Sequence, residues 1–125
     1  MVTGASRGIG RETAIRLAAL GHRVAVNYNS HPGDADDVVA TIKKAGGEAI
    51  SVGANVADRD AVKKMIDSVE AAYGPVEILI NNAGIISDSL LMRMKDSDFD
   101  RVIETNLKGT YNCCRLVVPA MVKSR

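Results

Sequence analysis

The sequence predicts an α/β fold in which a parallel sheet is covered by helices on both faces. Short segments that are apolar throughout alternate along the chain with segments whose apolar residues recur at helical spacing. A chain of 125 residues with an apolar share of 46% also suits one domain with one modest core. We therefore expect a single domain over residues 1–125, and right-handed crossovers make it half of a doubly wound sheet.

The expected elements follow one another in alternation. Asp34 and Asp58 are predicted to cap the second and third helices, and Gly46-Gly47 and Gly74-Pro75 to end them. The strands are predicted at Val2-Thr3, Val24–Val26, Ala49–Val52 and Ile78–Ile80, and the helices at 10–20, 35–45, 59–73, around 99–103 and around 111–121.

Composition excludes several functional classes. Sixteen basic against fifteen acidic side chains give a formal charge of +1, so no basic surface indicates nucleic acid, and aromatic side chains for stacking bases make up only 3%. The longest apolar runs are far shorter than the ~20 residues of a membrane helix, and the N-terminus lacks a signal-peptide pattern. Cys113 and Cys114 have no second pair to complete a metal site, so we expect buried thiols, no metal and a cytoplasmic protein.

The stretch TGASRGIG, residues 3–10, joins the first predicted strand to the first predicted helix. A glycine cluster is often a plain turn. Between a strand and a helix, however, glycines let a ligand approach the backbone, and the helix N-terminus attracts a pyrophosphate. The spacing of Gly4, Gly8 and Gly10 is G-x-x-x-G-x-G, which differs from the common G-x-G-x-x-G fingerprint.

With this spacing the loop resembles the cofactor loop of the short-chain dehydrogenase/reductase family. Further matches occur in the expected order, at Asn55-Val56 after the third strand, Asn81-Asn82-Ala83-Gly84 after the fourth, and Asn106 in the next helix. The resemblance runs along essentially the whole chain. It implies a Rossmann-type sheet with strand order 3-2-1-4, and makes residues 1–125 a partial NADP-binding domain.

The resemblance implies which residues bind the cofactor. Asn55 would accept a hydrogen bond from the adenine amino group, although it is equally compatible with a plain strand end. The second strand runs into Asn29-Ser30 with no acid, while Arg7 stands where NADP-dependent relatives carry a base, so NADP (NADPH) is favoured over NAD. Ser30 could donate to the 2′-phosphate, and His31 is interpreted as a solvated turn residue. The full implied set is Gly4, Ser6, Arg7, Gly8, Ile9, Gly10, Asn29, Ser30, Asn55, Val56, Asn82, Ala83 and Gly84.

Asn106 is the implied catalytic residue. In the family's Asn-Ser-Tyr-Lys set, this asparagine helps hold a water that links the active-site lysine to solvent. Helical spacing from Phe99 and Val102 predicts that the Asn106 amide faces the core. There a structural hydrogen bond to neighbouring backbone is the alternative role, and the two roles are compatible.

Residues Asp88–Lys95 and Ile103–Leu107 resemble the 3-oxoacyl-[acyl-carrier-protein] reductases. This implies NADPH-dependent reduction of 3-oxoacyl thioesters, carried on acyl carrier protein or coenzyme A, in fatty-acid synthesis. Relatives that reduce acetoacetyl-CoA or quinones share much of this pattern. The apolar residues between Leu90 and Met94 are also typical of a core or an interface.

The family's catalytic serine and Tyr-x-x-x-Lys are not recognisable. Tyr28 and Tyr73 have no lysine four residues later, and Tyr111, which is followed by Arg115, is expected to pack instead. We therefore expect the N-terminal half of a longer reductase, made as a fragment. The alternatives are an enzyme completed by another chain, and a non-catalytic nucleotide-binding module.

We also expect a homo-oligomer. The fourth strand would lie at an open edge of the sheet, and open apolar edges invite partners. In the family, the fifth helix belongs to the surface through which subunits assemble. Its predicted apolar stripe is Tyr111, Cys114, Val117, Val118 and Met121.

Overall fold

The computed structural model describes all residues from 1 to 125. Its regular sheet consists of β1 (Val24–Tyr28) and β2 (Ala49–Gly53), which pair in parallel with Val24 opposite Ala49. Both strands lie where the apolar segments predict them, and each extends further toward its carboxyl end than predicted.

The predicted first and fourth strands form single bridges instead of regular strands. Val2 bridges Val26 on one side and Ile80 on the other, both in parallel. The Val2 N–H donates to the Ala25 carbonyl and the Thr3 N–H to the Ile80 carbonyl, each at 3.0 Å. The order along the sheet is thus β2, β1, Val2, Ile80, which is the expected order 3-2-1-4. The first strand is short because the chain turns at Gly4, directly after Thr3.

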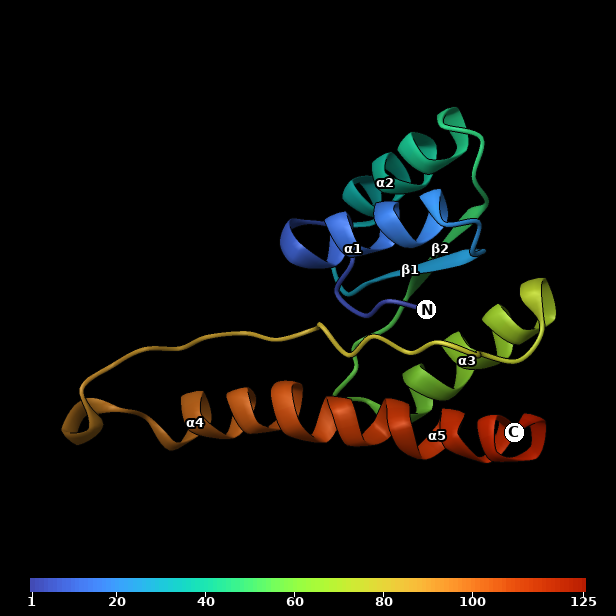
Figure 1. The fold of residues 1–125 in the computed structure, drawn as a ribbon. Helices are drawn as coiled ribbons and strands as arrows, with labels where there is room; N and C mark the ends of the chain where they lie inside the picture. Colours follow the sequence, from blue (N-terminus) through green and yellow to red (C-terminus); the bar gives the residue numbers. More distant parts are fainter.

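Helices cover both faces of this sheet (Figure 1). Helices α1 and α2 lie on one face, and α3 and α5 on the other. The helical segments are α1 (Gly8–Ala19), α2 (Pro32–Lys44), α3 (Arg59–Tyr73), the 3-10 turn η1 (Leu91–Arg93), α4 (Asp96–Ile103), the π-helical η2 (Glu104–Lys108) and α5 (Gly109–Ser124). None of them is long and apolar enough to cross a membrane.

Alternation along β1 creates two apolar layers. Val24 and Val26 pack with α1 and α2, whereas Ala25, between them in sequence, packs with α3 and α5. This follows from the period of two in a strand, because successive side chains point to opposite faces. The sheet is therefore buried on both sides, as the uniformly apolar strands predict.

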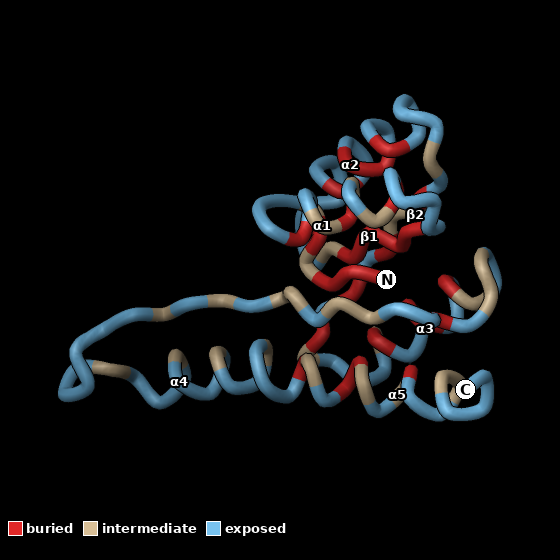
Figure 2. Tube along the Cα trace, viewed as in Figure 1, coloured by how far each residue is buried: buried red, intermediate tan, exposed pale blue.

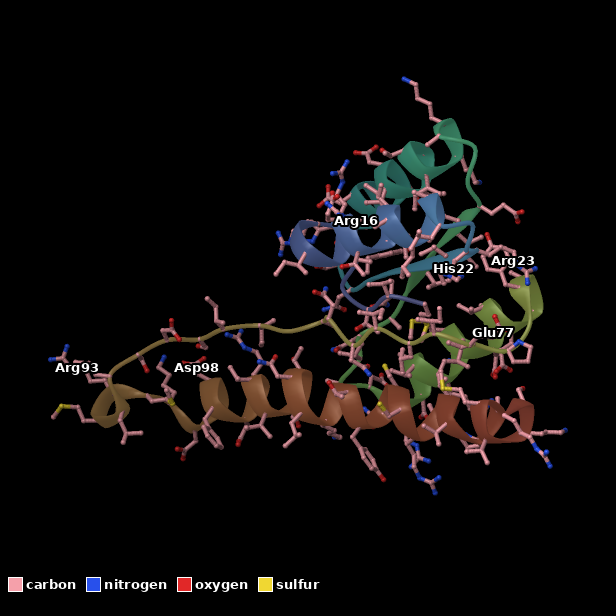
Figure 3. The ribbon with its side chains drawn as sticks, viewed as in Figure 1. Arg16, His22, Arg23, Glu77, Arg93 and Asp98 are labelled. Atoms are coloured by element: carbon pink, nitrogen blue, oxygen red, sulfur yellow. The ribbon has the colours of Figure 1, made fainter.

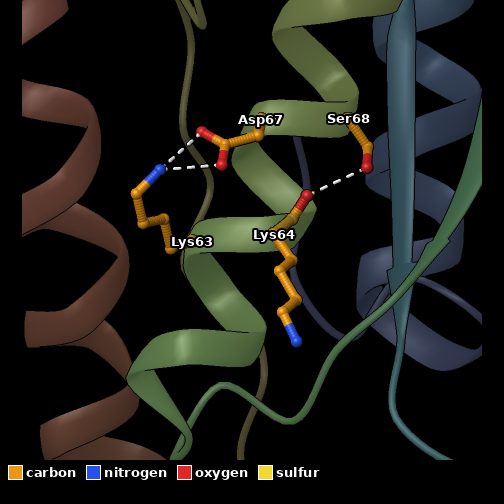
Figure 4. Close-up of polar contacts among 4 residues, drawn as sticks. All are labelled: Lys63, Lys64, Asp67 and Ser68. Carbon is orange, nitrogen blue, oxygen red and sulfur yellow. Dashed lines mark hydrogen bonds and ion pairs between the residues drawn. The ribbon is translucent and has the colours of Figure 1, made fainter.

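Helix α3 illustrates how local and tertiary signals agree. Asp58 is its N-cap, as predicted, and accepts hydrogen bonds from the N–H groups of Asp60 at 2.9 Å and Ala61 at 3.1 Å. On the outer face, Lys63 pairs with Asp67 at 2.7 Å (Figure 4). An exposed pair of this kind stabilises a helix by only ~0.3–0.5 kcal/mol. The buried face, Val62, Met65, Ile66 and Val69, therefore fixes the position of α3.

Three predicted helix boundaries are wrong, and the first is the start of α1, which lies at Gly8 and not at Gly10. Helix α2 begins at Pro32 with His31 as N-cap, and not after Asp34, because a proline suits the first helical position and an acid suits the first turn. The predicted fourth and fifth helices also join, since η2 connects α4 to α5 without a break. Gly109 does not interrupt the helix because it packs closely on Val56.

Residues 85–103 form an arm that projects beyond the two layers (Figure 1). The arm comprises the irregular segment after Gly84, η1 and α4, and α4 buries none of its residues. Figure 2 shows most of it as exposed. Phe99 and Ile103, predicted to face the core, are exposed because no layer lies opposite them.

Helix α5 buries a different face from the predicted one. Its buried residues are Gly109, Asn112, Cys113 and Val117. Of the predicted stripe, Val117 is buried, Cys114 and Met121 are half-buried, and Tyr111 and Val118 are exposed. The expectation that Tyr111 packs is therefore wrong within this chain, since only one side of α5 meets α3 and the sheet.

Candidate cofactor-binding site

A cleft of about 680 Å³ lies at the carboxyl ends of the strands. It is lined by the loop after Val2-Thr3, the loops after β1 and β2, and the segment after Ile80. The predicted residues that line it are Gly4, Ser6, Arg7, Ile9, Asn29, Ser30, Asn55, Val56, Asn82, Ala83 and Gly84. Gly8 and Gly10 belong to the same glycine-rich loop but do not line the cleft. Four segments that are distant in sequence thus meet at one site.

The glycine-rich loop depends on the absence of side chains at two positions. Gly4 has a φ of +59°, and a Cβ there would lie 2.9 Å from the Cα of Ala83. A Cβ on Gly10 would lie 2.5 Å from the Gly4 carbonyl oxygen and would also overlap the Asn82 amide. No side chain caps α1. The N–H groups of its first turn therefore have neither an intrahelical partner nor a side-chain cap, and Arg7 and Ile9 of this turn line the cleft.

Asn82 and Thr3 fasten two of the loops together. The Thr3 hydroxyl oxygen accepts hydrogen bonds from the N–H groups of Asn82 and Ala83, each at 3.0 Å. The Asn82 side-chain amide donates to the carbonyls of Thr3 and Gly4, each at 2.9 Å. The segment after Ile80 and the glycine-rich loop therefore hold one another in place.

Asn27 also positions these loops, and the sequence patterns did not single it out. It is 1% exposed, in the middle of the apolar β1. Its Oδ1 accepts from the Gly4 N–H at 3.1 Å, and its Nδ2 donates to the carbonyls of Val52 at 3.2 Å and Ala54 at 3.1 Å. The available signal was an amide within a buried strand, because such a group must find partners.

The charge around the cleft is positive. Arg7 and Arg101 line it, and no carboxylate does. Of the two arginines, sequence patterns indicated only Arg7. Arg101 and Thr105 come from α4 and η2, which continue into α5 and are together called the long helix. Ile85 and Ile86, which follow Gly84, also line the cleft. Arg101 forms an ion pair with Asp98, one turn away, at 3.8 Å, so the positive charge of the lining that has no ion-pair partner is that of Arg7. A positive cleft beside a helix N-terminus favours an anionic ligand.

Other charged groups lie elsewhere. Arg93 marks the tip of the arm, whereas His22, Arg23 and Glu77 gather at the amino ends of the strands (Figure 3). The hollow at that end holds only about 80 Å³, which is too small for a nucleotide. There Arg23 lies 5.4 Å from the centre of the Tyr73 ring, and burial followed by the charge of Glu48 raises the pKa of Tyr73.

Asn55 uses part of its hydrogen-bonding capacity within its own loop. Its Oδ1 accepts from the Ala57 N–H at 3.0 Å, and its carbonyl accepts from the Asp58 N–H at 3.0 Å. A carbonyl-type oxygen has two lone pairs. One therefore remains for the expected contact with an adenine amino group.

Asn106 lies outside the cleft lining, in the π-helical turn η2. Its Oδ1 accepts from the Ile85 N–H at 2.8 Å, and its Nδ2 donates to the Ile85 carbonyl at 2.9 Å. The expected bond to neighbouring backbone is therefore present. The expected burial is wrong, because Asn106 is exposed where the arm has no covering layer.

Known proteins resemble this chain in sequence and in fold. The family model for short chain dehydrogenases matches residues 1–125. The chain belongs to the short-chain dehydrogenase family. The family and the Rossmann-type sheet that the sequence predicts are thus confirmed.

The relatives of this chain include proteins named as reductases. The chain is 52% identical, over its whole length and 51% of the relative, to the 3-oxoacyl-[acyl-carrier-protein] reductase FabG of Staphylococcus epidermidis. It is 48% identical, over the same shares, to the 3-oxoacyl-[acyl-carrier-protein] reductase of a Synechocystis strain. A dehydrogenase/reductase crystal structure from Sinorhizobium meliloti superposes with a TM-score of 0.92 at 36% identity, covering 94% of this chain and 47% of that one. The chain spans about half the length of the curated relatives it matches.

Proposed function

We propose that this chain binds NADP(H) in the cleft and forms the cofactor-binding part of a reductase of 3-oxoacyl thioesters. The observation that carries the proposal is the lining of the cleft, which joins a glycine-rich loop, a helix N-terminus and two arginines without any carboxylate. A dinucleotide with an additional phosphate is the family cofactor that this charge suits best.

The residues present fit such a cofactor. The close packing of Gly4 on Ala83, and of Gly10 on the Gly4 carbonyl and the Asn82 amide, fixes the glycine-rich loop beside the first turn of α1, where a pyrophosphate would bind. Arg7 and Ser30 are proposed to bind the 2′-phosphate, and Asn55 the adenine amino group. Asn82, Ala83 and Gly84 would provide a small-residue surface for the remainder. When bound, the cofactor supplies a hydride to a carbonyl.

The substrate proposal rests on the relatives, and the assembly proposal rests on the exposed apolar residues of α5 and the open sheet edge. Two of the relatives are named as 3-oxoacyl-[acyl-carrier-protein] reductases, so an acyl-carrier-protein-linked or CoA-linked 3-oxoacyl thioester is the proposed substrate, in cytoplasmic fatty-acid synthesis. Asn106 is proposed to act in catalysis with groups from outside residues 1–125. Residues 1–125 are proposed to be one partial domain that assembles as a homo-oligomer.

The cofactor proposal is tested by replacing Arg7. A hydrogen bond to a charged group contributes ~1.5–3 kcal/mol. Arg7→Ala should therefore raise the Kd for NADPH by about 10–100-fold and the Kd for NADH far less. Calorimetric titration of both cofactors measures the two losses.

Arg11 provides the matched control, because it lies exposed one turn further along α1 and does not line the cleft. Arg11→Ala should change neither Kd. Equal losses for NADPH and NADH in the Arg7 variant would refute the assignment of Arg7, and no binding of NADPH by the unmutated chain would refute the proposed function.

A further inference from the structure

The buried side chain of Asn112, on α5, does not line the cleft but is hydrogen-bonded to the loop that follows β2. Resting on the proposed function, we propose that Asn112 is a positioning residue for the adenine half of the cofactor, acting through Val56 and Ala57. It would not touch the cofactor.

The hydrogen bonds of Asn112 link segments that are far apart in sequence. Asn112 is 2% exposed, and its Nδ2 donates to the carbonyls of Val56 at 2.9 Å and Ala57 at 3.3 Å. A carbonyl left without a partner in a buried place is costly. The loop therefore has a strong preference for the position at which both carbonyls meet the amide.

Packing one turn earlier on α5 restrains the same loop. A Cβ on Gly109 would lie 2.5 Å from the Cγ2 of Val56, so the bare helix backbone touches this valine. Val56 is 5% exposed and also lines the cleft. Its side chain is thus fixed between α5 and the ligand space.

Two further contacts restrain the loop that follows β2. Its next residue, Asp58, caps α3, and Asn55 closes a turn on the Ala57 N–H. With α3 on one side and α5 on the other, Asn112 determines how far Asn55 and Val56 reach into the cleft. The adenine side of the cofactor would depend on it most, because Asn82 fastens the glycine-rich loop from the segment after Ile80, which Asn112 does not contact.

The test compares three variants of the chain by titration with NADPH and with 2′,5′-ADP, which represents the adenine half alone. Asn112→Ala removes both hydrogen bonds. Gly109→Ala displaces Val56 while raising helix propensity. Val117→Ala, a buried residue of the same helix face that does not contact the loop carbonyls, lowers stability without moving the loop.

We expect Asn112→Ala to raise the Kd for both ligands by the same factor, about tenfold, and Gly109→Ala to act in the same direction. Val117→Ala should leave both values within about twofold of those of the unmutated chain once the folded fraction is measured. Equal losses in NADPH and 2′,5′-ADP would locate the effect at the adenine half.

Two results overturn the inference, and they differ from failure of the proposed function. If Asn112→Ala and Gly109→Ala bind both ligands as tightly as the unmutated chain, Asn112 does not position the adenine loop. If Val117→Ala loses as much affinity as Asn112→Ala, the effect is general stability. If the unmutated chain binds neither ligand, the proposed function itself is wrong and the inference falls with it.

Discussion

Asn27, Asn82 and Asn112 bond to backbone groups of the loops that surround the cleft. An amide suits this task because it both donates and accepts, whereas an ionised carboxylate cannot donate to a carbonyl. No buried side-chain nitrogen or oxygen lacks a hydrogen-bond partner. Sequence motifs indicated Asn82, but not Asn27 or Asn112, because an isolated amide in an apolar segment does not reveal which backbone groups it will meet.

Replacing Gly10, at the start of α1, and Gly33, at the start of α2, by alanine should have opposite effects on stability. In Gly10→Ala the methyl group would overlap the Gly4 carbonyl and the Asn82 amide, so we expect destabilisation by ~1–3 kcal/mol and weaker NADPH binding. In Gly33→Ala nothing lies within 4 Å of the methyl group, and stability should stay equal or rise by up to ~1 kcal/mol. Urea unfolding measures both. A Gly10→Ala variant as stable as Gly33→Ala and the unmutated chain would show that the loop is not closely packed.

Because Cys113 is buried, the free energy of unfolding should depend on pH through the ionisation of its thiol. Desolvation, with a smaller contribution from Cys114, raises the pKa of the Cys113 thiol from 9.0 to about 11. The folded chain therefore holds the proton more tightly than the unfolded chain. The corresponding stability is fully present below pH 9 and is lost as the pH rises through about 11.

Urea unfolding between pH 8 and 12 measures this loss, and Cys113→Ala is the control. Tyr73 also has a raised pKa and remains in the variant, so the difference between the two curves isolates Cys113. Parallel curves for the two proteins would contradict the prediction.

At the scale of elements, apolar periodicity predicted which segments are helices and strands, but not how they join. Phe99 and Tyr111 lie on two apolar stripes with polar residues between them, and this gap predicted two helices. The structure bridges the gap with the π-helical turn η2, where Asn106 bonds to Ile85. That contact is tertiary, so local periodicity could not predict it.

Burial of the long helix was predicted poorly for a related reason. A period of 3.6 identifies an apolar face, but it does not show whether anything lies opposite that face. Val117 has α3 and the sheet opposite it, whereas Phe99 and Leu107 have neither and are exposed. The strand order, in contrast, followed from the family resemblance, and the backbone bonds of Val2 agree with it.

For the whole molecule, exposed apolar groups predict self-association. Phe99, Leu107, Tyr111, Val118 and Val122 are all exposed along the long helix. The segment around Ile80 pairs with Val2 only, which leaves an open sheet edge. We expect a dimer or a larger species at micromolar concentration, held through the helix, the edge or both.

Light scattering measures the mass of the species in solution. Val118→Lys tests the contribution of α5 to self-association, and we expect this substitution to lower the associated fraction. A clean monomer with the Ile78–Ile80 segment protected from hydrogen exchange would show that the half-sheet shields its own edge.

The second prediction at this scale concerns turnover. Reduction of a carbonyl needs a proton donor, and no Tyr-x-x-x-Lys is recognisable in residues 1–125. We therefore expect the purified chain not to oxidise NADPH in the presence of acetoacetyl-CoA, measured by absorbance in a preparation free of host reductase. Turnover comparable to that of a full-length relative would contradict this.

A segment that carries the family's serine and Tyr-x-x-x-Lys provides the complementary measurement. Restored NADPH oxidation on co-expression would support the reductase. Cofactor binding without any turnover would favour a nucleotide-binding module.

The arm of residues 85–103 contributes part of one wall of the cleft without sharing the core that supports the other walls. Ile85, Ile86 and Arg101 line the cleft from the arm, yet α4 buries nothing, and the paired bonds between Asn106 and Ile85 tie its two sides together. Segments with few buried contacts open at a lower free energy than the core. We therefore expect the arm to open at a lower free energy than the sheet, so that the width of the cleft on this side, and with it the rate at which a ligand enters and leaves, depends on a part of the molecule that the core does not hold.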